Sequence, residues 1–389
     1  MRIALVAGET SGDTLGAALV EALKRRFPNA EFAGVAGPKM RAAGCTAWHD
    51  IDELAVMGLT EVITHLPRLM RLRAQLRRQI LDWRPDVFVG VDYKEFNLGL
   101  ARQLKLAGLA TVQYVSPQVW AWRQGRVRTI GESVDLVLCL FPFEPDFYRE
   151  HGVRAAFVGH PLADQIPLEA DRAAARAELG LPADDRVLAV LPGSRRGEVE
   201  KLADVFAGAT ELLAARVPGL VTIAPMVTPA LRDLFAERCA QHAPTARVRM
   251  LDGQARLALA AADVVLVASG TATLETALFR RPMVVAYKLG FITAFLLRRL
   301  RMVKIEHFSQ PNLLAGKELV PEFFQEQANA GNLADALANW FDHPERVTRV
   351  QGEFAAIHEQ LRRGGAELAA AEIAALLTAW TASAEAEAR

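Results

Sequence analysis

The chain has 389 residues, 51% of them hydrophobic, which is sufficient for two globular domains with separate cores. Its 45 basic and 45 acidic residues cancel, so the composition argues against a nucleic-acid partner, which a net basic surface would attract. Three widely spaced cysteines argue against a disulfide framework or a metal site, and predict buried thiols in a reducing compartment.

The apolar run at residues 3–6 is too short for a signal peptide and leads directly to a glycine turn. No uncharged apolar run approaches the ~18 residues that span a bilayer. We therefore expect a cytoplasmic protein whose contact with a membrane is peripheral.

Residues 3–7 form the first expected strand, followed by a loop at 8–13 and an amphipathic helix over residues 14–26. The loop has neither the G-x-G-x-x-G spacing nor the lysine of a P-loop. We expect it to face a substrate, because glycines let a ligand approach the backbone, although a plain tight turn is the alternative. The residues assigned to this loop are Gly8, Glu9, Ser11, Gly12 and Asp13.

A strand over residues 31–35 and a helix near Lys39 precede the triplet Asp50, Ile51, Asp52. Such a triplet can hold a divalent metal through its carboxylate oxygens. Here the flanking residues indicate a loop, and beyond the adjacent Glu53 no other carboxylates cluster nearby. We therefore predict no metal at this position.

Residues 57–78 interleave apolar and arginine side chains around Pro67. A basic amphipathic stretch with a central proline is typical of a hairpin lying on an anionic lipid surface. The pattern alone favours the alternative, an ordinary surface helix whose apolar face packs inward. The residues assigned to membrane or acyl-chain contact are Val62, Ile63, Leu66, Leu69 and Met70.

Asp92 directly follows an expected buried strand at residues 86–91. Ligands of open α/β sheets bind at the carboxyl ends of the strands, so Asp92 is the best-placed general base in the first half of the chain. Glu95 is the second choice. Alternatively, Asp92 caps the helix that starts near Phe96.

The next expected strand, residues 111–115, leads into a loop with two tryptophans and an arginine. Aromatic side chains at this edge of the sheet predict a pocket wall. Arg123, Arg126 and Arg128 favour a phosphorylated substrate. The loop residues assigned to the acceptor site are Ser116, Trp120, Trp122 and Arg123.

Strands at residues 136–140 and 155–158 complete the first half, and a connector rich in Ala, Pro and charged residues follows it. His160, at the start of this connector, is assigned to a cleft between domains. A lone histidine in a loop is more often structural.

The second half opens with a strand that ends at Leu191 and turns through Gly193, Ser194 and Arg195 into a helix. A guanidinium and the free N–H groups of a helix start suit phosphate oxygens, and a diphosphate in particular. The alternative is an ordinary turn with a surface arginine.

A second strand of this kind, residues 264–268, turns through Ser269, Gly270 and Thr271 into a helix over residues 271–278. Glu275 lies about one turn into that helix, where it can accept hydrogen bonds from the two hydroxyls of a ribose. Alternatively, its negative charge only interacts favourably with the positive end of the helix dipole. Taken together with Arg195, this turn predicts nucleotide binding.

The alternation of strand and helix continues with strands at residues 221–224, 247–250 and 283–287. We predict an α/β protein of GT-B type, with two Rossmann-like domains facing across a cleft and C-terminal helices packing back on the first domain. A second basic apolar patch at residues 289–304 contributes Phe291 and Phe295 to membrane contact. The expected boundaries are residues 1–165, a linker at 166–185, a second domain at 186–345 and the C-terminal helices at 346–389.

Several motifs resemble those of the lipid-A-disaccharide synthase family, in order and over nearly the whole chain. They are Gly8 to Asp13; Met57, Gly58 and Glu61; Ser116, Pro117 and Val119 to Arg123; Phe141 to Glu144; Gly159 to Asp164; Leu191 to Arg195; Ala268 to Glu275; and Asn312 to Ala315. The residue Met57 is assigned to the acceptor cleft on this basis.

The resemblance implies an inverting, metal-independent glycosyltransferase that needs no cofactor. Its substrates would be UDP-2,3-diacylglucosamine and 2,3-diacylglucosamine 1-phosphate, and its products the β-1,6 disaccharide of lipid A and UDP. Asp92 holds the position of the proposed base, Arg195 that of the diphosphate arginine, and Asn312 that of a polar residue important for activity. The resemblance also implies a location on the cytoplasmic face of the inner membrane of a Gram-negative bacterium, and a homodimer in some members.

The chain departs from the family pattern at Tyr93 and Lys94, where many members have Ala-Pro, and at Gln118, where serine is common. These departures affect the expected shape of the local loops and not the chemistry, because neither removes a proposed catalytic group. Two other functions fit parts of the pattern. A UDP-N-acetylglucosamine 2-epimerase would share the nucleotide contacts, and a nucleotide-binding membrane adaptor would have no use for Asp92.

Overall fold

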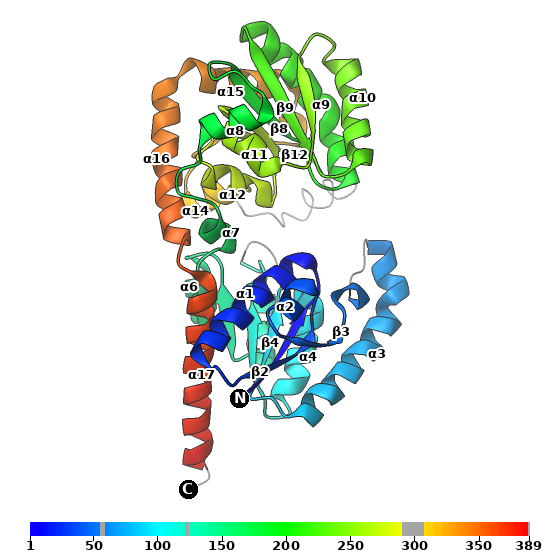
Figure 1. Cartoon of the computed structure of the whole chain (residues 1–389), viewed down its shortest axis with the longest axis vertical. Helices are drawn as coiled ribbons and strands as arrows, with labels where there is room; N and C mark the ends of the chain where they lie inside the picture. Colours follow the sequence, from blue (N-terminus) through cyan, green and yellow to red (C-terminus); the bar gives the residue numbers. More distant parts are fainter. Residues whose placement is uncertain (55–58, 121–123, 290–306, 388–389) are drawn as a thin grey trace. The chain divides into compact units, whose positions relative to one another are not determined.

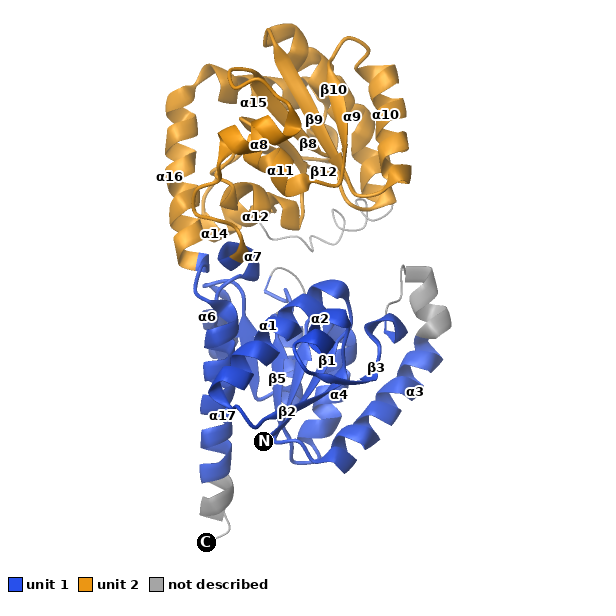
Figure 2. Cartoon of the chain, viewed as in Figure 1, with its two compact units in different colours: residues 1–164, 361–389 blue, residues 165–360 orange. Residues whose placement is uncertain are grey.

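The computed structural model describes residues 1–54, 59–120, 124–289 and 307–387, and the side chains of residues 59–65, 124 and 383–387 are outside the description. The chain divides into two compact units (Figure 2). Unit 1 comprises residues 1–164 and 361–389, and unit 2 comprises residues 165–360. Among the described residues, no helix combines the length and the apolar character needed to cross a membrane.

Unit 1 is built on a parallel seven-stranded sheet, of which Figure 1 labels β2, β3 and β4. The strand order is β3-β2-β1-β4-β5-β6-β7. The central strands are short apolar runs buried on both faces, as is usual where helices cover a parallel sheet. The strands are β1 (Arg2–Ala7), β2 (Glu31–Val35), β3 (Thr46–His49), β4 (Val87–Val91), β5 (Ala110–Tyr114), β6 (Leu136–Cys139) and β7 (Ala155–Phe157).

Helices cover this sheet, and the C-terminal helix returns to pack against α1. Ala369, Ile373 and Leu376 of that helix belong to the same buried core as the strands. The helices of unit 1 are α1 (Thr10–Arg26), α2 (Pro38–Ala42), α3 (Leu59–Trp83), α4 (Lys94–Lys105), α5 (Val127–Ser133), α6 (Glu144–Glu150), α7 (Pro161–Gln165, ending at the boundary) and α17 (Gly365–Glu387).

Unit 2 contains a parallel six-stranded sheet in the order β10-β9-β8-β11-β12-β13. Its strands are β8 (Arg186–Leu191), β9 (Leu220–Met226), β10 (Val248–Asp252), β11 (Val264–Ala268), β12 (Met283–Tyr287) and β13 (Glu322–Phe324). Its helices are α8 (Arg172–Leu179), α9 (Arg196–Arg216), α10 (Pro229–His242), α11 (Ala255–Ala261), α12 (Thr271–Leu278), α14 (Gln310–Ala315), α15 (Ala330–Asp342) and α16 (Pro344–Leu361).

Both sheets reverse their strand order once, between β1 and β4 in unit 1 and between β8 and β11 in unit 2. In doubly wound sheets the crevice at this reversal is where ligands bind. The strand ends are level there, with Ala7 paired to Val91 and Leu191 paired to Val267. The predicted fold class, α/β with two Rossmann-like sheets, is confirmed.

The structure corrects three local expectations. The helix after β1 starts at Thr10, so most of the expected loop 8–13 is helical. Residues 59–83 form the single helix α3 with Pro67 inside it, not a hairpin. The expected linker 166–185 contains α8, whose Ala175 and Leu179 are buried and which packs against α11 within unit 2.

The C-terminal region also differs from the expected division. The helix α16 lies within unit 2 almost to its end, and the chain re-enters unit 1 at Leu361. The backbone N–H of His160 donates to the Leu361 carbonyl at 2.9 Å, and Asp164 accepts the N–H groups of Gly364 and Gly365. Of the helices expected to pack back on the first domain, α17 therefore belongs to unit 1, whereas α16 belongs to unit 2 as far as Gln360.

Candidate active site

Asp92 lies at the end of β4, beside the strand reversal of unit 1. It has a φ of 51°, and Tyr93, which follows it, has a φ of 37°. Two consecutive non-glycine residues in the left-handed region are uncommon and occur preferentially at functional sites. The N-cap position of α4 is held by Tyr93 and not by Asp92, so the capping alternative does not explain the aspartate.

The Asp92 side chain is partly buried, and this burial raises the pKa of its carboxyl above the usual range. A hydrogen bond from the Tyr93 backbone and the positive charge of Lys94 oppose that rise. Glu95, in contrast, has a side chain that is 66% exposed and forms a bidentate ion pair with Arg126. Asp92 is therefore the better placed of the two as a proton acceptor.

The residues that lead from β1 into the first turn of α1 lie against the Asp92 turn. A Cβ on Gly8 would lie 2.4 Å from Cγ of Tyr93, so only glycine fits against that ring. A Cβ on Gly12 would lie 3.4 Å from the Val91 carbonyl oxygen. Glu9 and Ser11 are exposed. These two polar side chains stand at the strand reversal that carries Asp92.

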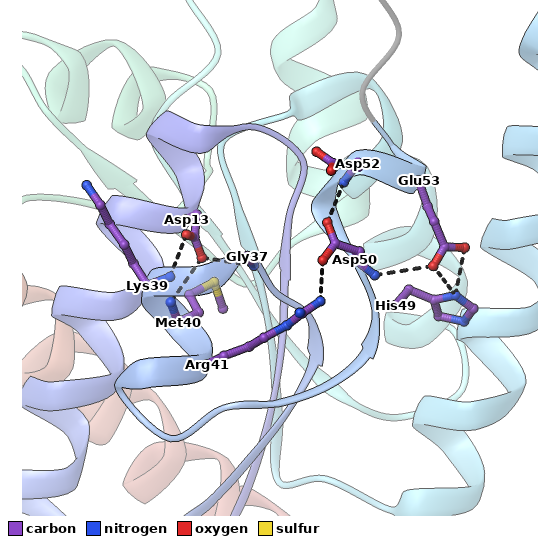
Figure 3. A network of polar contacts seen from close by, with 9 residues as sticks. All are labelled: Asp13, Gly37, Lys39, Met40, Arg41, His49, Asp50, Asp52 and Glu53. Carbon is purple, nitrogen blue, oxygen red and sulfur yellow. Dashed lines mark hydrogen bonds and ion pairs between the residues drawn. The ribbon is translucent and has the colours of Figure 1, made fainter.

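Asp13 was expected to face substrate, but it is buried and faces α2 (Figure 3). Its Oδ1 accepts the backbone N–H groups of Gly37 and Met40 at 2.9 and 3.0 Å, and its Oδ2 accepts that of Lys39 at 2.9 Å. These are donors of a helix start that would otherwise be unsatisfied. Asp13 is thus a structural residue that fixes α2 to α1.

The residues around Asp50 form a second polar network in the same view (Figure 3). Asp50 accepts the N–H of Asp52 at 2.9 Å and pairs with Arg41, and Glu53 contacts His49 at 3.1 Å. The aspartates therefore close a short 3-10 turn, residues 51–53. Across the described residues, no group of three or more His, Cys, Asp or Glu side chains is arranged to hold a metal.

Ser116 and Trp120 lie in a network centred on the buried carboxyl of Glu144, a residue of the motif Phe141 to Glu144 that was not assigned to the site. Glu144 accepts the Trp120 indole N–H at 3.1 Å and the backbone N–H groups of Leu140 and Phe141 at 3.1 and 3.0 Å. Burial raises the pKa of Glu144 to about 7, against these hydrogen bonds. The network anchors the start of the tryptophan loop.

His160 is 8% exposed and stacks on Phe141, with ring centroids 5.6 Å apart. Burial lowers its pKa to about 4, so it is neutral near pH 7 and its Nδ1 accepts the N–H of Leu162. His160 is therefore a packed residue of unit 1. Three other residues assigned to the acceptor site, Met57, Trp122 and Arg123, lie outside the described residues.

Arg195 stands at the N-cap of α9, and its side chain is 82% exposed. The turn before it depends on Gly193, whose φ is 130° and where a Cβ would lie 2.8 Å from Cβ of Glu198. The N–H groups of Ser194 and Arg195, expected to be free, donate to Oε2 of Glu198 at 3.1 and 3.3 Å. Glu198 thus occupies donors that suit a phosphate.

The turn Ser269, Gly270, Thr271 follows β11, which is the strand paired with β8 in the sheet. Gly270 and Thr271 are exposed at the start of α12. Ser269 Oγ donates to the Phe308 carbonyl at 3.2 Å, which ties this turn to the start of α14. Glu275, on α12, accepts Nε of Arg256 at 2.9 Å. The Arg195 turn and the α12 start therefore share one edge of the unit 2 sheet.

Asn312 is fully buried, and each of its four hydrogen-bonding positions has a protein partner. Its Nδ2 donates to the Val320 carbonyl and to Glu322 at 2.8 and 2.9 Å, and its Oδ1 accepts the N–H groups of Leu319 and Val320 at 2.8 and 3.0 Å. Glu322 in turn accepts the N–H groups of Phe308 and Ser309. Asn312, itself in α14, therefore fixes the start of this helix to residues 319–322.

A family profile described as lipid-A-disaccharide synthetase matches residues 3–374. The chain belongs to the lipid-A-disaccharide synthase family. A protein of that name from Xanthomonas campestris pv. campestris (strain 8004) is 52% identical over 378 residues, which cover 97% of this chain and 86% of the relative. Another from Xylella fastidiosa (strain M12) is 50% identical over 377 residues, 97% of this chain and 98% of the relative. The resemblance predicted from the motifs is confirmed, and the chain is a glycosyltransferase of lipid A biosynthesis.

Solved structures of other proteins share the fold of this lipid-A-disaccharide synthase family member. Anabaena Alr3699/HepE in complex with UDP and glucose has a TM-score of 0.56 at 13% identity, over 96% of this chain and 99% of that chain. UDP-GlcNAc 2-epimerase from Neisseria meningitidis bound to UDP-GlcNAc has a TM-score of 0.59 at 11% identity, over 97% and 100%. Likenesses at such low identity show the fold alone.

In this family member, the helix α3 presents two kinds of apolar residue. Leu72, Leu76 and Ile80 are buried in the core of unit 1, whereas Leu66 and Met70 are 50% and 53% exposed. Leu69 is partly buried against the core. The side chains of Val62 and Ile63 and the residues Phe291 and Phe295 lie outside the described residues. The interpretation of residues 57–78 as a surface helix with an inward apolar face therefore holds at Leu72 and Leu76, and membrane contact at Leu66 and Met70 stays a prediction.

Gln113, Gly90 and Glu198 had signals in the sequence that were not used. Gln113 is an amide inside a fully buried strand, and Gly90 interrupts the neighbouring strand. Glu198 follows Arg195 by three residues, which is the spacing of a capping box. Glu144 carries no such local signal, because its partners are brought to it by tertiary packing.

Proposed function

We propose that the chain transfers a diacylglucosaminyl group from UDP-2,3-diacylglucosamine to the 6-hydroxyl of 2,3-diacylglucosamine 1-phosphate, with inversion and without a metal. Asp92 takes the hydroxyl proton as the oxygen attacks the anomeric carbon, and the bond from that carbon to the diphosphate oxygen breaks, so that the electron pair leaves with UDP. The observation that carries this proposal is the partly buried carboxyl of Asp92, held in a left-handed turn at the strand reversal.

The donor half of the proposal rests on unit 2. The guanidinium of Arg195 and the exposed start of α12 lie at one sheet edge, where they would neutralise the charge that develops on the leaving diphosphate. Glu198 forms an ion pair with Arg195, so it has to release that side chain when the donor binds. Glu275 would accept hydrogen bonds from the ribose hydroxyls, either beside its hydrogen bond from Arg256 or after that bond breaks.

The membrane part of the proposal rests on α3. Leu66 and Met70 are exposed next to Arg68 and Arg71, which are exposed as well. Apolar side chains flanked by arginines favour a peripheral position on an anionic membrane. Relatives from Xanthomonas and Xylella support the inner membrane of a Gram-negative bacterium as its location, at the cytoplasmic face. The homodimer stays a prediction of the family resemblance.

Mass spectrometry of a reaction containing both lipid substrates tests the proposal. A disaccharide 1-phosphate that appears together with equimolar UDP supports it. A 2-epimer of the UDP-sugar has the same mass as the substrate and is detected by NMR spectroscopy of the recovered UDP-sugar; its formation without use of the acceptor would indicate an epimerase. Binding of UDP without turnover of either lipid would indicate a nucleotide-binding adaptor, and both of these outcomes contradict the proposal.

A further inference from the structure

Two buried side-chain amides converge on the carbonyl oxygen of Asp92. Gln113 Nε2, from β5, donates to it at 2.9 Å, and Asn97 Nδ2, from α4, donates to it at 3.0 Å. Both side chains are 0% exposed. The carbonyl of a residue with a left-handed φ is thus held from two different elements of unit 1.

The Gln113 amide also reaches the end of its own strand. Its Nε2 lies 3.3 Å from the carbonyl oxygens of Tyr114 and Val115. Val115 has a φ of 78°, which is an outlier for a β-branched residue. Gln113 therefore contacts both left-handed turns at this sheet edge, one bearing the Asp92 carboxyl and the other leading to Ser116 and the tryptophan loop.

A glycine in the adjacent strand makes room for this pair of amides. Gly90 is the ladder partner of Gln113. A Cβ at Gly90 would lie 2.8 Å from Cβ of Asn97 and 3.1 Å from Oε1 of Gln113. Glycine weakens a strand interior, so its presence in β4 is explained by the space that the two side chains need.

This arrangement works against stability in two respects. Among the described residues, the amide oxygens Asn97 Oδ1 and Gln113 Oε1 are buried without a hydrogen-bond partner, which is unfavourable. The left-handed φ at Asp92, Tyr93 and Val115 is unfavourable for side chains of these types. Features maintained against stability are typical of sites that hold reactive groups in place.

We infer that Asn97 and Gln113 are positioning residues, which clamp the Asp92 carbonyl and thereby hold the Asp92 carboxyl in the direction that its reaction requires. The inference rests on the proposed role of Asp92 as the base. Neither amide needs to touch a substrate, because each acts through the backbone of Asp92.

The test compares Gln113→Leu with Thr111→Val. Leucine is close to glutamine in size and removes the donor. Thr111 is equally buried and hydrogen-bonded, but at the other end of β5, to Asp135 at 2.9 Å. We expect Gln113→Leu to lower kcat by ~10–100-fold while the KM for the UDP-sugar changes less than about twofold. Thr111→Val should leave both parameters near their wild-type values although it lowers the Tm.

Two further measurements separate this inference from the role of Asp92. In an Asp92→Asn background, Gln113→Leu should change the residual rate by less than about twofold, because it acts through Asp92. In a crystal structure of Gln113→Leu, Asp92 should leave the left-handed region. Wild-type kcat in Gln113→Leu, or a positive φ retained at Asp92 in that structure, overturns the inference. Full activity of Asp92→Asn overturns the base assignment instead, and the crystal structure still decides whether the clamp exists.

Discussion

Glu198 holds the side chain of Arg195 at the start of α9, with Oε1 lying 3.2 Å from Nη1. The other oxygen of the same carboxylate accepts the N–H groups of Ser194 and Arg195. The Arg195 guanidinium and the two backbone N–H groups, which are three donors that suit a phosphate, therefore all contact the Glu198 carboxylate. A nucleotide diphosphate that binds here competes with this carboxylate.

Replacing Glu198 with glutamine keeps the size of the side chain and removes the competing charge. Because an exposed ion pair contributes ~0.2–1 kcal/mol, we expect UDP to bind about 1.5- to 5-fold more tightly to Glu198→Gln by isothermal titration calorimetry. Glu200→Gln is the matched control, since Glu200 pairs with Arg196 at 2.7 Å, likewise on the first turns of α9. A loss of UDP affinity in Glu198→Gln would instead make Glu198 a residue that positions Arg195 for the donor.

Asn312→Ala should lower the stability of unit 2, and any loss of activity should follow from that loss of stability. The change leaves the buried carbonyl of Val320 and the N–H groups of Leu319 and Val320 without their partner, at ~1–3 kcal/mol for a buried unsatisfied group. We expect a lower Tm by differential scanning calorimetry. The control Asn329→Ala removes the exposed cap of α15, at ~1 kcal/mol, together with its donations to the carbonyls of Glu326 and Gln327. An unchanged Tm together with loss of UDP binding would show that Asn312 contacts the ligand.

Serine substitutions at exposed and at buried apolar residues of α3 should have different effects on membrane binding and on Tm. Leu66→Ser with Met70→Ser removes apolar surface that is already exposed, so we expect loss of co-sedimentation with anionic vesicles and little change in Tm. Leu72→Ser, at a buried position, should lower the Tm by creating a cavity and burying a hydroxyl. If the double variant sediments like the wild type, Leu66 and Met70 are not membrane contacts.

The pH dependence of kcat/KM should report the Asp92 environment. A base must be deprotonated, so activity falls as the pH drops through its pKa, and burial places the pKa of Asp92 above the usual value for aspartate. Lys94 lowers that pKa, so Lys94→Met should move the acid limb to higher pH. Arg102→Met is the control on the same helix, because Arg102 pairs with Glu132 at 3.0 Å. A limb that Lys94→Met leaves in place contradicts this assignment.

Much of the fold could be predicted because its central strands are continuous apolar runs. Residues 31–35, 264–268 and 283–287 and the helix at 271–278 agree with β2, β11, β12 and α12. The edge strands β3 and β13 were missed because they are half-buried and have no such run. The helix α8 was taken for a linker because its Ala-rich, charged sequence is typical of connectors, whereas Asp171 caps it and α11 covers it.

The candidate site was predictable where it depends on strand ends and not where it depends on packing. Asp92, Arg195 and Ser269 follow buried strands, so their sheet edges could be inferred. Asp13 was misplaced because its hydrogen-bond partners lie 24 to 27 residues further along the chain. The environment of Glu144 likewise results from side chains that only the folded unit brings together.

The most direct test of the central claim measures two properties of Asp92→Asn. Mass spectrometry gives its rate of disaccharide formation, and calorimetry gives its affinity for UDP. Asparagine keeps the shape of the side chain but cannot accept the hydroxyl proton as a base. We predict a fall in turnover of at least ~10²-fold with UDP affinity close to that of the wild type. Wild-type turnover in Asp92→Asn would contradict the account and would move the base to another residue, with Glu95 examined first.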